Sequence, residues 1–345
     1  MPINKKTNMF ARKRPFVIAE VAQSHDGSLG CAHAFVEAVA RTGADAIKFQ
    51  THIAAAESTP AEPWRVKFSL QDKTRYDYWK RMEFSEEQWL GLRKHADTLG
   101  LKFIGTPFSM AAVSLLKRVG VYAWKVGSGE TVNLPMIEAL AATNLPIIIS
   151  TGMSPVSEVD RAVSILRSAC SEYAVLQCST AYPCPPEQVG LNMLAEFKER
   201  YSCPVGISDH SGTIYPGIAA TALGAKVIEV HVSLSREMFG PDVSSSVTTD
   251  ELRQLVRGVH FISKSINNPI NKDVLAASKM ELKRMFGKSI VAAVPLKKGL
   301  TLKSSHLTLK KPGTGLGPEM LTSVVGHKLK RKVDTDTQIL RKDYE

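Results

Sequence analysis

Short apolar segments alternate with helical segments along most of the chain. The apolar segments lie at 16–20, 45–50, 102–106, 122–126, 146–150, 173–177, 204–207 and 226–228. The segments predicted as helices lie at 29–41, 86–99, 110–119, 134–142, 156–170, 193–201, 213–224 and 248–265. Eight strand–helix units within roughly 250 residues are typical of a (β/α)8 TIM barrel. A doubly wound open sheet is the alternative, but no GxGxxG motif follows the first strand.

The end of each predicted strand carries a polar or ionisable side chain. These residues are Glu20, Lys48 with Gln50, Thr106, Lys125 with Ser128, Ser150, Gln177 with Thr180 and Tyr182, Ser208 with His210, and His231. In a TIM barrel the carboxyl ends of all strands meet at one face, where the chemistry gathers. Solubility alone does not require Lys and Glu at strand ends, because loops could supply the charge. The pattern therefore predicts a functional site at this face.

Two histidines follow the last two predicted strands. His210 and His231 are separated by a segment of helical composition that ends in Gly224. A strand–helix–strand unit needs a parallel crossover, so both strand ends point the same way. Two imidazoles at one rim could ligate a divalent metal ion, with the adjacent acids Asp209 and Glu229 orienting them. Two packed or hydrogen-bonded core histidines fit the spacing about as well.

Lysines and hydroxyl side chains occupy most of the other strand ends. They are Lys48, Lys125, Thr106, Ser128, Ser150 and Ser208. Such a set can neutralise and hydrogen-bond a phosphate, or a ligand with both a phosphate and a carboxylate. Glu20 could act as a general base or hold a water, and an ion pair with one of the lysines is an equally good interpretation. Beside a metal that activates a carbonyl, these groups favour carbon–carbon bond formation or cleavage between a phosphorylated enol and an aldehyde.

The sequence pattern changes at both ends of the chain. Residues 1–14 form a basic N-terminal extension without the apolar segment of a secretory signal. Residues 15–270 form the predicted barrel and 271–286 a linker, with a helix expected at 276–285. Residues 287–345 contain short β-like segments and predict a small second domain with a marginal core of its own.

Composition excludes several classes of protein. With 44% hydrophobic and 22% charged residues, the chain is expected to be an ordinary globular protein. No apolar segment approaches the roughly 20 residues of a membrane helix, so we expect a cytoplasmic location and no membrane partner. The five cysteines lack CxxC spacing and are interpreted as reduced thiols. The net charge of +11 suits anionic small substrates, and because no nucleic-acid motif accompanies the basic segments, no nucleic-acid partner is expected.

Eight ordered motifs resemble the sialic acid (N-acetylneuraminate) synthase family. They are FVIAE (16–20), GADAIKFQ (43–50), KVGSGE (125–130), ISTGM (149–153), QCSTAYP (177–183), ISDH (207–210), LGAKVIEVH (223–231) and GPD (240–242). The resemblance extends over residues 15–345, and the region from 287 is similar to the family's antifreeze-like (SAF) domain.

The resemblance implies a condensation of phosphoenolpyruvate with an open-chain N-acetylated hexosamine, with water addition and phosphate release. It implies that His210 and His231 bind Mn²⁺, with Mg²⁺ or Co²⁺ as alternatives, and that Glu20 handles the attacking water with Lys48 and Lys125 as further catalytic groups. The implied phosphoenolpyruvate contacts are Lys48, Thr106, Lys125, Ser128, Ser150 and Ser208. The implied sugar-site positions are Gln50, Thr180, Tyr182, Asp242 and Lys311. A domain-swapped homodimer is also implied, in which the SAF domain caps the partner's barrel.

Departures from the family pattern concern the acceptor sugar. Thr180 stands at a position where the family frequently has Asn, and Lys311 at one where it frequently has Arg. Unlike Arg, Lys is not a planar bidentate hydrogen-bond donor. N-acetylmannosamine, giving N-acetylneuraminate, and a diacetamido-trideoxyhexose, giving legionaminic or pseudaminic acid, are both open. Further alternatives are a metal aldolase and a catalytically silent carbohydrate- or nucleic-acid-binding protein.

Overall fold

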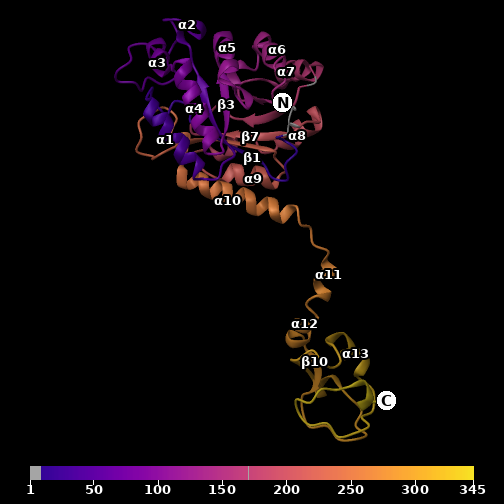
Figure 1. The fold of residues 1–345 in the computed structure, drawn as a ribbon. Coiled ribbons are helices and arrows are strands. Elements are labelled where there is room, and N and C mark those ends of the chain that lie inside the picture. Colours follow the sequence, from indigo (N-terminus) through magenta and orange to yellow (C-terminus); the bar gives the residue numbers. More distant parts are fainter. Residues whose placement is uncertain (1–8, 170) are drawn as a thin grey trace. The chain divides into compact units, whose positions relative to one another are not determined.

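The computed structural model describes residues 9–169 and 171–345. These residues form two compact units, the first ending at Asn268 and the second running from Pro269 to Glu345 (Figure 1). Residues 1–8 of the predicted basic extension and Cys170 at the end of a predicted helix lie outside the described residues.

Eight parallel strands close into a barrel in the first unit (Figure 1). They are β1 (Phe16–Glu20), β2 (Ala46–Thr51), β3 (Lys102–Pro107), β4 (Ala123–Val126), β5 (Ile147–Ser150), β6 (Tyr173–Cys178), β7 (Val205–Asp209) and β8 (Val227–Ser233). Strand β1 pairs with both β2 and β8, so the barrel has no free edge. A short strand, β9 (Val247–Thr248), extends the pairing of β8. The predicted TIM barrel is confirmed.

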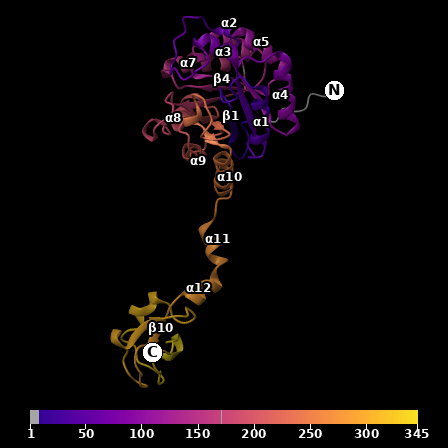
Figure 2. The same cartoon turned by 90° about the vertical axis from the view of Figure 1, so that its left-hand side faces the viewer.

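Helices cover the outside of the barrel (Figures 1 and 2). They are α1 (Leu29–Ala40), α4 (Glu86–Thr98), α5 (Met110–Val119), α6 (Leu134–Ala141), α7 (Val156–Ser168), α8 (Met193–Tyr201), α9 (Tyr215–Ala222) and α10 (Thr249–Ile266). The two predicted capping boxes are present, because Ser85 with Gln88 opens α4 and Thr248 with Glu251 opens α10.

The segment 52–81, predicted as an irregular insert, contains two helices. These are α2 (Ala54–Glu57) and α3 (Arg75–Met82). Helix α3 starts with a capping box in which Thr74 and Asp77 bond each other's backbone N–H groups. This capping pattern is visible in the sequence and was missed, because α3 is short and precedes no strand.

Side chains alternate between the two sides of each barrel strand, as β geometry requires. On β1, Val17 and Ala19 face the helices, whereas Phe16 and Ile18 belong to a cluster inside the barrel. Apolar inward positions on the other strands complete this inner cluster: Ala46, Ile104, Ala123, Ile148, Ala174, Leu176 and Val227. Two residues further along β1 the inward position is Glu20. The interior is therefore apolar along most of its length and polar at the carboxyl ends of the strands.

Residues before β1 close the amino-terminal end of the barrel. Met9 and Phe10 are buried within the inner cluster. Arg12 and Arg14 each lie 2.6 Å from a carboxylate oxygen of Asp45, which also accepts a hydrogen bond from the Val17 amide. Part of the predicted extension is thus attached to the barrel by apolar burial and ion pairs.

The second unit has its own small core. Its strands β10 (Ser289–Ala292) and β11 (Leu307–Lys310) pair antiparallel. The buried residues are Ile290, Ala292, Leu296, Leu302, Leu307, Val324, Leu329, Val333, Ile339 and Tyr344. A four-residue helix, α13 (Leu321–Val324), also belongs to this unit.

Two short helices precede that core in place of the single helix predicted at 276–285. They are α11 (Lys272–Ala277) and α12 (Met280–Phe286). Helix α11 begins earlier than predicted because the Asn271 side chain accepts hydrogen bonds from two amides of its first turn. Among the described residues, no helix is both long enough and apolar enough to span a membrane.

Candidate active site

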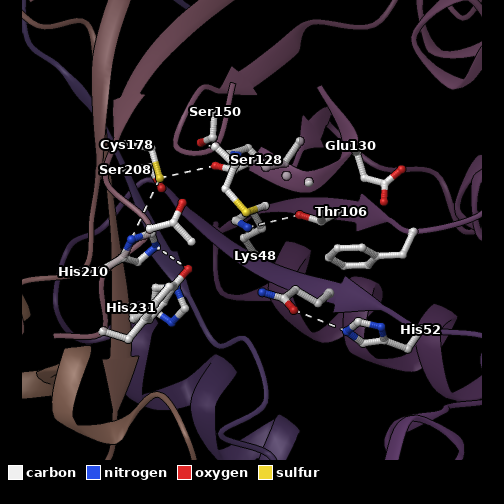
Figure 3. Close-up of a pocket in the computed structure, with 18 of the residues that line it drawn as sticks. Lys48, His52, Thr106, Ser128, Glu130, Ser150, Cys178, Ser208, His210 and His231 are labelled. Atoms are coloured by element: carbon white, nitrogen blue, oxygen red, sulfur yellow. Dashed lines mark hydrogen bonds between the residues drawn. The ribbon is translucent and has the colours of Figure 1, made fainter. Parts of the chain in front are cut away.

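A pocket of about 350 Å³ opens at the carboxyl ends of the barrel strands (Figure 3). Eleven of the predicted site residues line it: Lys48, Gln50, Thr106, Lys125, Ser128, Ser150, Thr180, Tyr182, Ser208, His210 and His231. Glu20 is fully buried and does not line the pocket. Asp242 lines an adjoining pocket of about 360 Å³, to which Gln50, Tyr182 and His231 also contribute.

Lys48 connects three neighbouring strands at the base of the pocket. Lys48 on β2 pairs in register with Glu20 on β1, and its ammonium group forms an ion pair with Oε2 of Glu20. The same nitrogen donates to Thr106 Oγ1 on β3 at 3.1 Å. The interpretation of Glu20 as an ion-pair partner therefore holds in this structure, and it leaves the proton-transfer role as a proposal.

Lys125 lies across the barrel from β8. Its Nζ donates to Ser150 Oγ at 2.6 Å and to the Val126 carbonyl at 2.9 Å. It also lies 3.9 Å from Oε1 of Glu229, an oxygen that is 3.7 Å from Lys48 Nζ. Ser208 donates to this same oxygen at 2.9 Å. Glu229 is thus the anion shared by both lysines.

The sequence interpretation assigned Glu229 only to the orientation of a histidine. A signal for its true position was present, because Glu229 precedes His231 by two residues and side chains two apart on a strand share a face. Cys178 was also missed as a lining residue, although it follows the inward positions Ala174 and Leu176 by the same spacing. Its thiol accepts a hydrogen bond from Ser128 at 3.4 Å.

Burial and neighbouring charges shift the pKa of each ionisable group at the base. Burial raises the pKa of Glu20, and Lys48 opposes this effect. Burial disfavours the charged form of Lys48, but Glu20 and Glu229 raise its pKa above the ordinary value. Burial lowers the pKa of Lys125 against the attraction of Glu229. Burial disfavours ionised Glu229 too, but Lys125 and Lys48 lower its pKa. The group contains two potential cations and two potential anions, all almost completely buried.

The two histidines predicted as metal ligands lie next to each other. The ring centroids of His210 and His231 are 5.0 Å apart, with the ring planes at 68°. Nδ1 of His210 donates to the Ser179 carbonyl at 2.9 Å, which leaves Nε2 with a lone pair, 3.3 Å from the Tyr182 hydroxyl. A ring nitrogen bound to a backbone carbonyl is the usual arrangement of a metal-ligating histidine.

The surroundings of His231 are a second observation in favour of its prediction as a metal-coordinating residue. Its side chain is buried, and Nδ1 has no hydrogen-bond partner among the described residues. Burial, and then the neighbouring His210, hold the pKa of His231 well below its ordinary value, so the ring is in the neutral form that a metal needs. Within the described residues, no group of three or more His, Cys, Asp or Glu is arranged to hold a metal ion. A metal ion held here would have at most these two imidazoles as protein ligands, with water or substrate at its other positions, so the metal site stays a prediction.

Two of the residues predicted for a sugar site both contact an arginine of the segment 52–81. The guanidinium carbon of Arg65 lies 4.3 Å from the ring centroid of Tyr182, and an Arg65 nitrogen lies 3.4 Å from Asp242 Oδ1. Lys311 belongs to the second unit, where its Nζ lies 5.2 Å from the ring centroid of Phe286. The structure thus brings all the predicted site residues of the first unit together, and Lys311 is described within its own unit only.

Several lining residues come from the segment 52–82, to which no site role had been assigned. They are His52, Glu57, Glu62, Trp64, Arg65, Val66, Phe68, Arg75, Tyr78 and Trp79. Their positions depend on how the segment folds over the strand ends, and no periodicity in the sequence signals this.

Comparison with known proteins identifies similar chains across nearly the whole length. The family model described as "NeuB family" matches residues 35–271. An N,N'-diacetyllegionaminic acid synthase from Campylobacter jejuni is 33% identical over 95% of this chain and 99% of its own length. The human N-acetylneuraminate-9-phosphate synthase is 33% identical over 94% of this chain and 91% of its own length. Among solved structures, the N-acetylneuraminic acid synthetase of Leptospira borgpetersenii in complex with citrate matches with a TM-score of 0.69 and 28% identity, covering 79% of this chain and 92% of that one.

Proposed function

Because the chain belongs to the NeuB family, whose members are phosphoenolpyruvate-utilising synthases, we propose that it is a nonulosonate synthase. It condenses phosphoenolpyruvate with the open-chain form of an N-acetylated hexosamine, adds water at C2 of the donor and releases phosphate. The cytoplasm, where phosphoenolpyruvate is made, is the proposed location.

The observation that carries this proposal is the convergence of two buried lysines and four hydroxyls beside two neutral imidazoles. Lys48 and Lys125 are each at most 3% exposed. Thr106, Ser128, Ser150 and Ser208 line the same pocket. Such a set would offset part of the charge of a dianionic phosphate and a carboxylate on one small molecule, and charge-assisted hydrogen bonds would fix its orientation.

A divalent ion, most simply Mn²⁺, with Mg²⁺ or Co²⁺ as alternatives, is proposed between His210 and His231. When bound, it would supply Lewis-acid polarisation of the acceptor's aldehyde oxygen. The protein orients the proposed ligand His210 through the Ser179 carbonyl, which accepts a hydrogen bond from its Nδ1. Tyr182 places a hydroxyl beside Nε2 of the same ring.

Glu20 is the proposed proton-transfer group for the water that attacks C2. Its carboxylate is fully buried, Oε1 has no hydrogen-bond partner among the described residues, and Oε2 faces Lys48. Burial raises the pKa of Glu20, which makes its carboxylate a stronger proton acceptor.

N-acetylmannosamine is the proposed acceptor, giving N-acetylneuraminate. A diacetamido-trideoxyhexose is the alternative, because one similar protein is named a diacetyllegionaminic acid synthase. A 6-phosphorylated acceptor is a further candidate, since another is named an N-acetylneuraminate-9-phosphate synthase. Gln50, Thr180, Tyr182, Asp242 and Lys311 are the proposed sugar contacts.

We also propose that residues 287–345 form an SAF domain that caps the barrel of a second copy. Exposed apolar side chains between residue 270 and the end of α12 support this arrangement. They are Ile270, Val274, Met280, Leu282, Met285 and Phe286, which are between 46% and 69% exposed. Large apolar side chains exposed in such number are typical of a segment that another protein surface covers.

The test is release of inorganic phosphate from phosphoenolpyruvate in the presence of Mn²⁺ and one acceptor at a time. The acceptors are N-acetylmannosamine, its 6-phosphate and a 2,4-diacetamido-2,4,6-trideoxyhexose. Phosphate release that depends on one of them identifies the acceptor. A metal aldolase would release no phosphate. A catalytically silent binding protein would show no turnover, and its His210→Ala variant would bind ligand as the unaltered protein does.

A further inference from the structure

His52 is held in the pocket wall between two aromatic rings. Its ring centroid lies 4.1 Å from that of Trp79, with the planes 15° apart, and 4.6 Å from that of Phe108, with the planes 11° apart. The side chain is buried, at the pocket edge seen in Figure 3. Because both faces of the imidazole are covered, only its nitrogen-bearing edges are left to form hydrogen bonds.

One ring nitrogen of His52 faces a carboxylate. Nδ1 lies 2.6 Å from Oε1 of Glu57, whose other oxygen accepts from the Ile53 amide at 3.2 Å. A carboxylate only accepts hydrogen bonds, so Nδ1 carries the proton and donates. A neutral ring then has its lone pair at Nε2.

The other ring nitrogen faces the amide of Gln23. The Gln23 NH₂ group lies 2.9 Å from His52 Nε2 and 2.7 Å from Oε1 of Gln50. An NH₂ group has two hydrogens, so it satisfies both acceptors at once. The 3.3 Å contact between His52 Nε2 and Gln50 Oε1 then joins two lone pairs and is not a hydrogen bond in this tautomer.

These bonds determine which end of the Gln50 amide is available to a ligand. Its carbonyl oxygen is occupied by Gln23, and no described residue accepts a hydrogen bond from its NH₂ group. Gln50 lines both pockets, as does Trp79, which holds His52. The pocket is therefore offered a hydrogen-bond donor at this point.

We propose that Glu57, His52 and Gln23 form a positioning relay that fixes the Gln50 amide with its NH₂ group toward the acceptor sugar. The inference rests on the proposed function. It implies that the Gln50 NH₂ group donates a hydrogen bond to an oxygen of the acceptor sugar, either a hydroxyl or an acetamido carbonyl. It also gives the segment 52–82 a role in acceptor recognition, since His52, Glu57 and Trp79 all belong to it.

The first test is a double-mutant cycle of His52→Phe and Gln50→Ala, in which the steady-state kinetic constants are measured. Phenylalanine keeps the stack between Trp79 and Phe108 and removes both nitrogens. We expect the KM for the acceptor to rise about tenfold, as for loss of one well-placed hydrogen bond, while the KM for phosphoenolpyruvate stays within about twofold. In a Gln50→Ala background, His52→Phe should change acceptor kcat/KM no further, because the relay acts through Gln50. His260→Phe, on the exposed surface of α10, is the matched control.

Additive effects of His52→Phe and Gln50→Ala, or an equal rise of both KM values, would overturn the relay and leave His52 a structural residue. A second measurement does not depend on turnover: ¹⁵N NMR of the histidine rings, assigned by comparison with His52→Phe, should show Nδ1–H and an unprotonated Nε2. An Nε2–H tautomer overturns the relay in any case. If the unaltered protein releases no phosphate with any acceptor, the proposed function is contradicted. The relay is then still tested by the His52 tautomer measured by NMR.

Discussion

Oε1 of Glu229 lies 3.9 Å from the ammonium nitrogen of Lys125, and both side chains are almost completely buried inside the barrel. The two residues belong to β8 and β4, which do not pair with each other. Within the described residues, no other carboxylate lies within 4 Å of Lys125 Nζ. Lys125 therefore depends on this one anion, whereas Lys48 also has Glu20.

Glu229→Gln should destabilise the protein by about 3 kcal/mol, because removing one partner of a buried pair leaves the other charge uncompensated. Urea unfolding measures the change. Asp160→Asn, which breaks an exposed ion pair with Arg200, is the control and should cost less than about 1 kcal/mol. Equal effects of the two substitutions would show that Glu229 does not neutralise a buried charge.

Glu20→Gln should keep phosphoenolpyruvate binding and lose phosphate release by a factor of about 100 or more, the usual contribution of a positioned proton-transfer group. Calorimetric binding and a phosphate assay separate the two effects. Glu237→Gln, at an exposed position, is the control. A fully active Glu20→Gln enzyme would leave Glu20 as the ion-pair partner of Lys48 alone.

His231→Ala should weaken Mn²⁺ binding by at least about tenfold and abolish most turnover, since it removes one of two protein ligands. The free Mn²⁺ signal in electron paramagnetic resonance measures binding without reference to activity. His260→Ala should bind Mn²⁺ as the unaltered protein does. Unchanged binding by the His231 variant would contradict the ligand assignment.

Stability should fall in acid through Asp45. Burial favours its neutral form, but hydrogen bonds from Arg14, the Val17 amide and Arg12 hold the pKa of Asp45 below its ordinary value of 3.8. A lowered folded-state pKa adds stability that is present above pH 3.8 and is lost as pH falls through the folded-state value.

Asp45→Asn should therefore lower the free energy of unfolding by about 2 kcal/mol at pH 7, and the difference from the unaltered protein should shrink below about pH 4. Denaturant unfolding at several pH values measures this. The control is Asp97→Asn, whose partner Arg93 is an exposed i,i+4 neighbour. A difference that is independent of pH would show that the ionisation of Asp45 is not the cause.

Val274→Asp combined with Met285→Asp should shift the protein from dimer to monomer at micromolar concentration, because both side chains are exposed and would lie in the proposed interface. Sedimentation velocity gives the mass. Leu223→Asp, also exposed but at the end of α9, should not change it. A monomeric unaltered protein would contradict the proposed exchange of domains.

The sequence alone determined the barrel and most of the site's membership. Strand–helix alternation is a local property, and period-two geometry directs residues such as Lys48, Lys125 and His231 to one face once the strands are known. The composition of that face also led to the predicted chemistry, which stays a prediction, because ammonium, hydroxyl and imidazole groups are not needed at strand ends for stability.

Only the tertiary structure decided which of these groups pair. Closure of β8 on β1 brings Glu229 between Lys48 and Lys125. The pairing of β1 with β2 places Glu20 against Lys48, where it is fully buried and does not line the pocket. The contacts of His52 with Trp79 and Gln23 depend on how the segment 52–82 folds over the strand ends. Such contacts arise from packing between distant segments, which no local periodicity encodes, and this is why the relay behind Gln50 could not be predicted from the sequence.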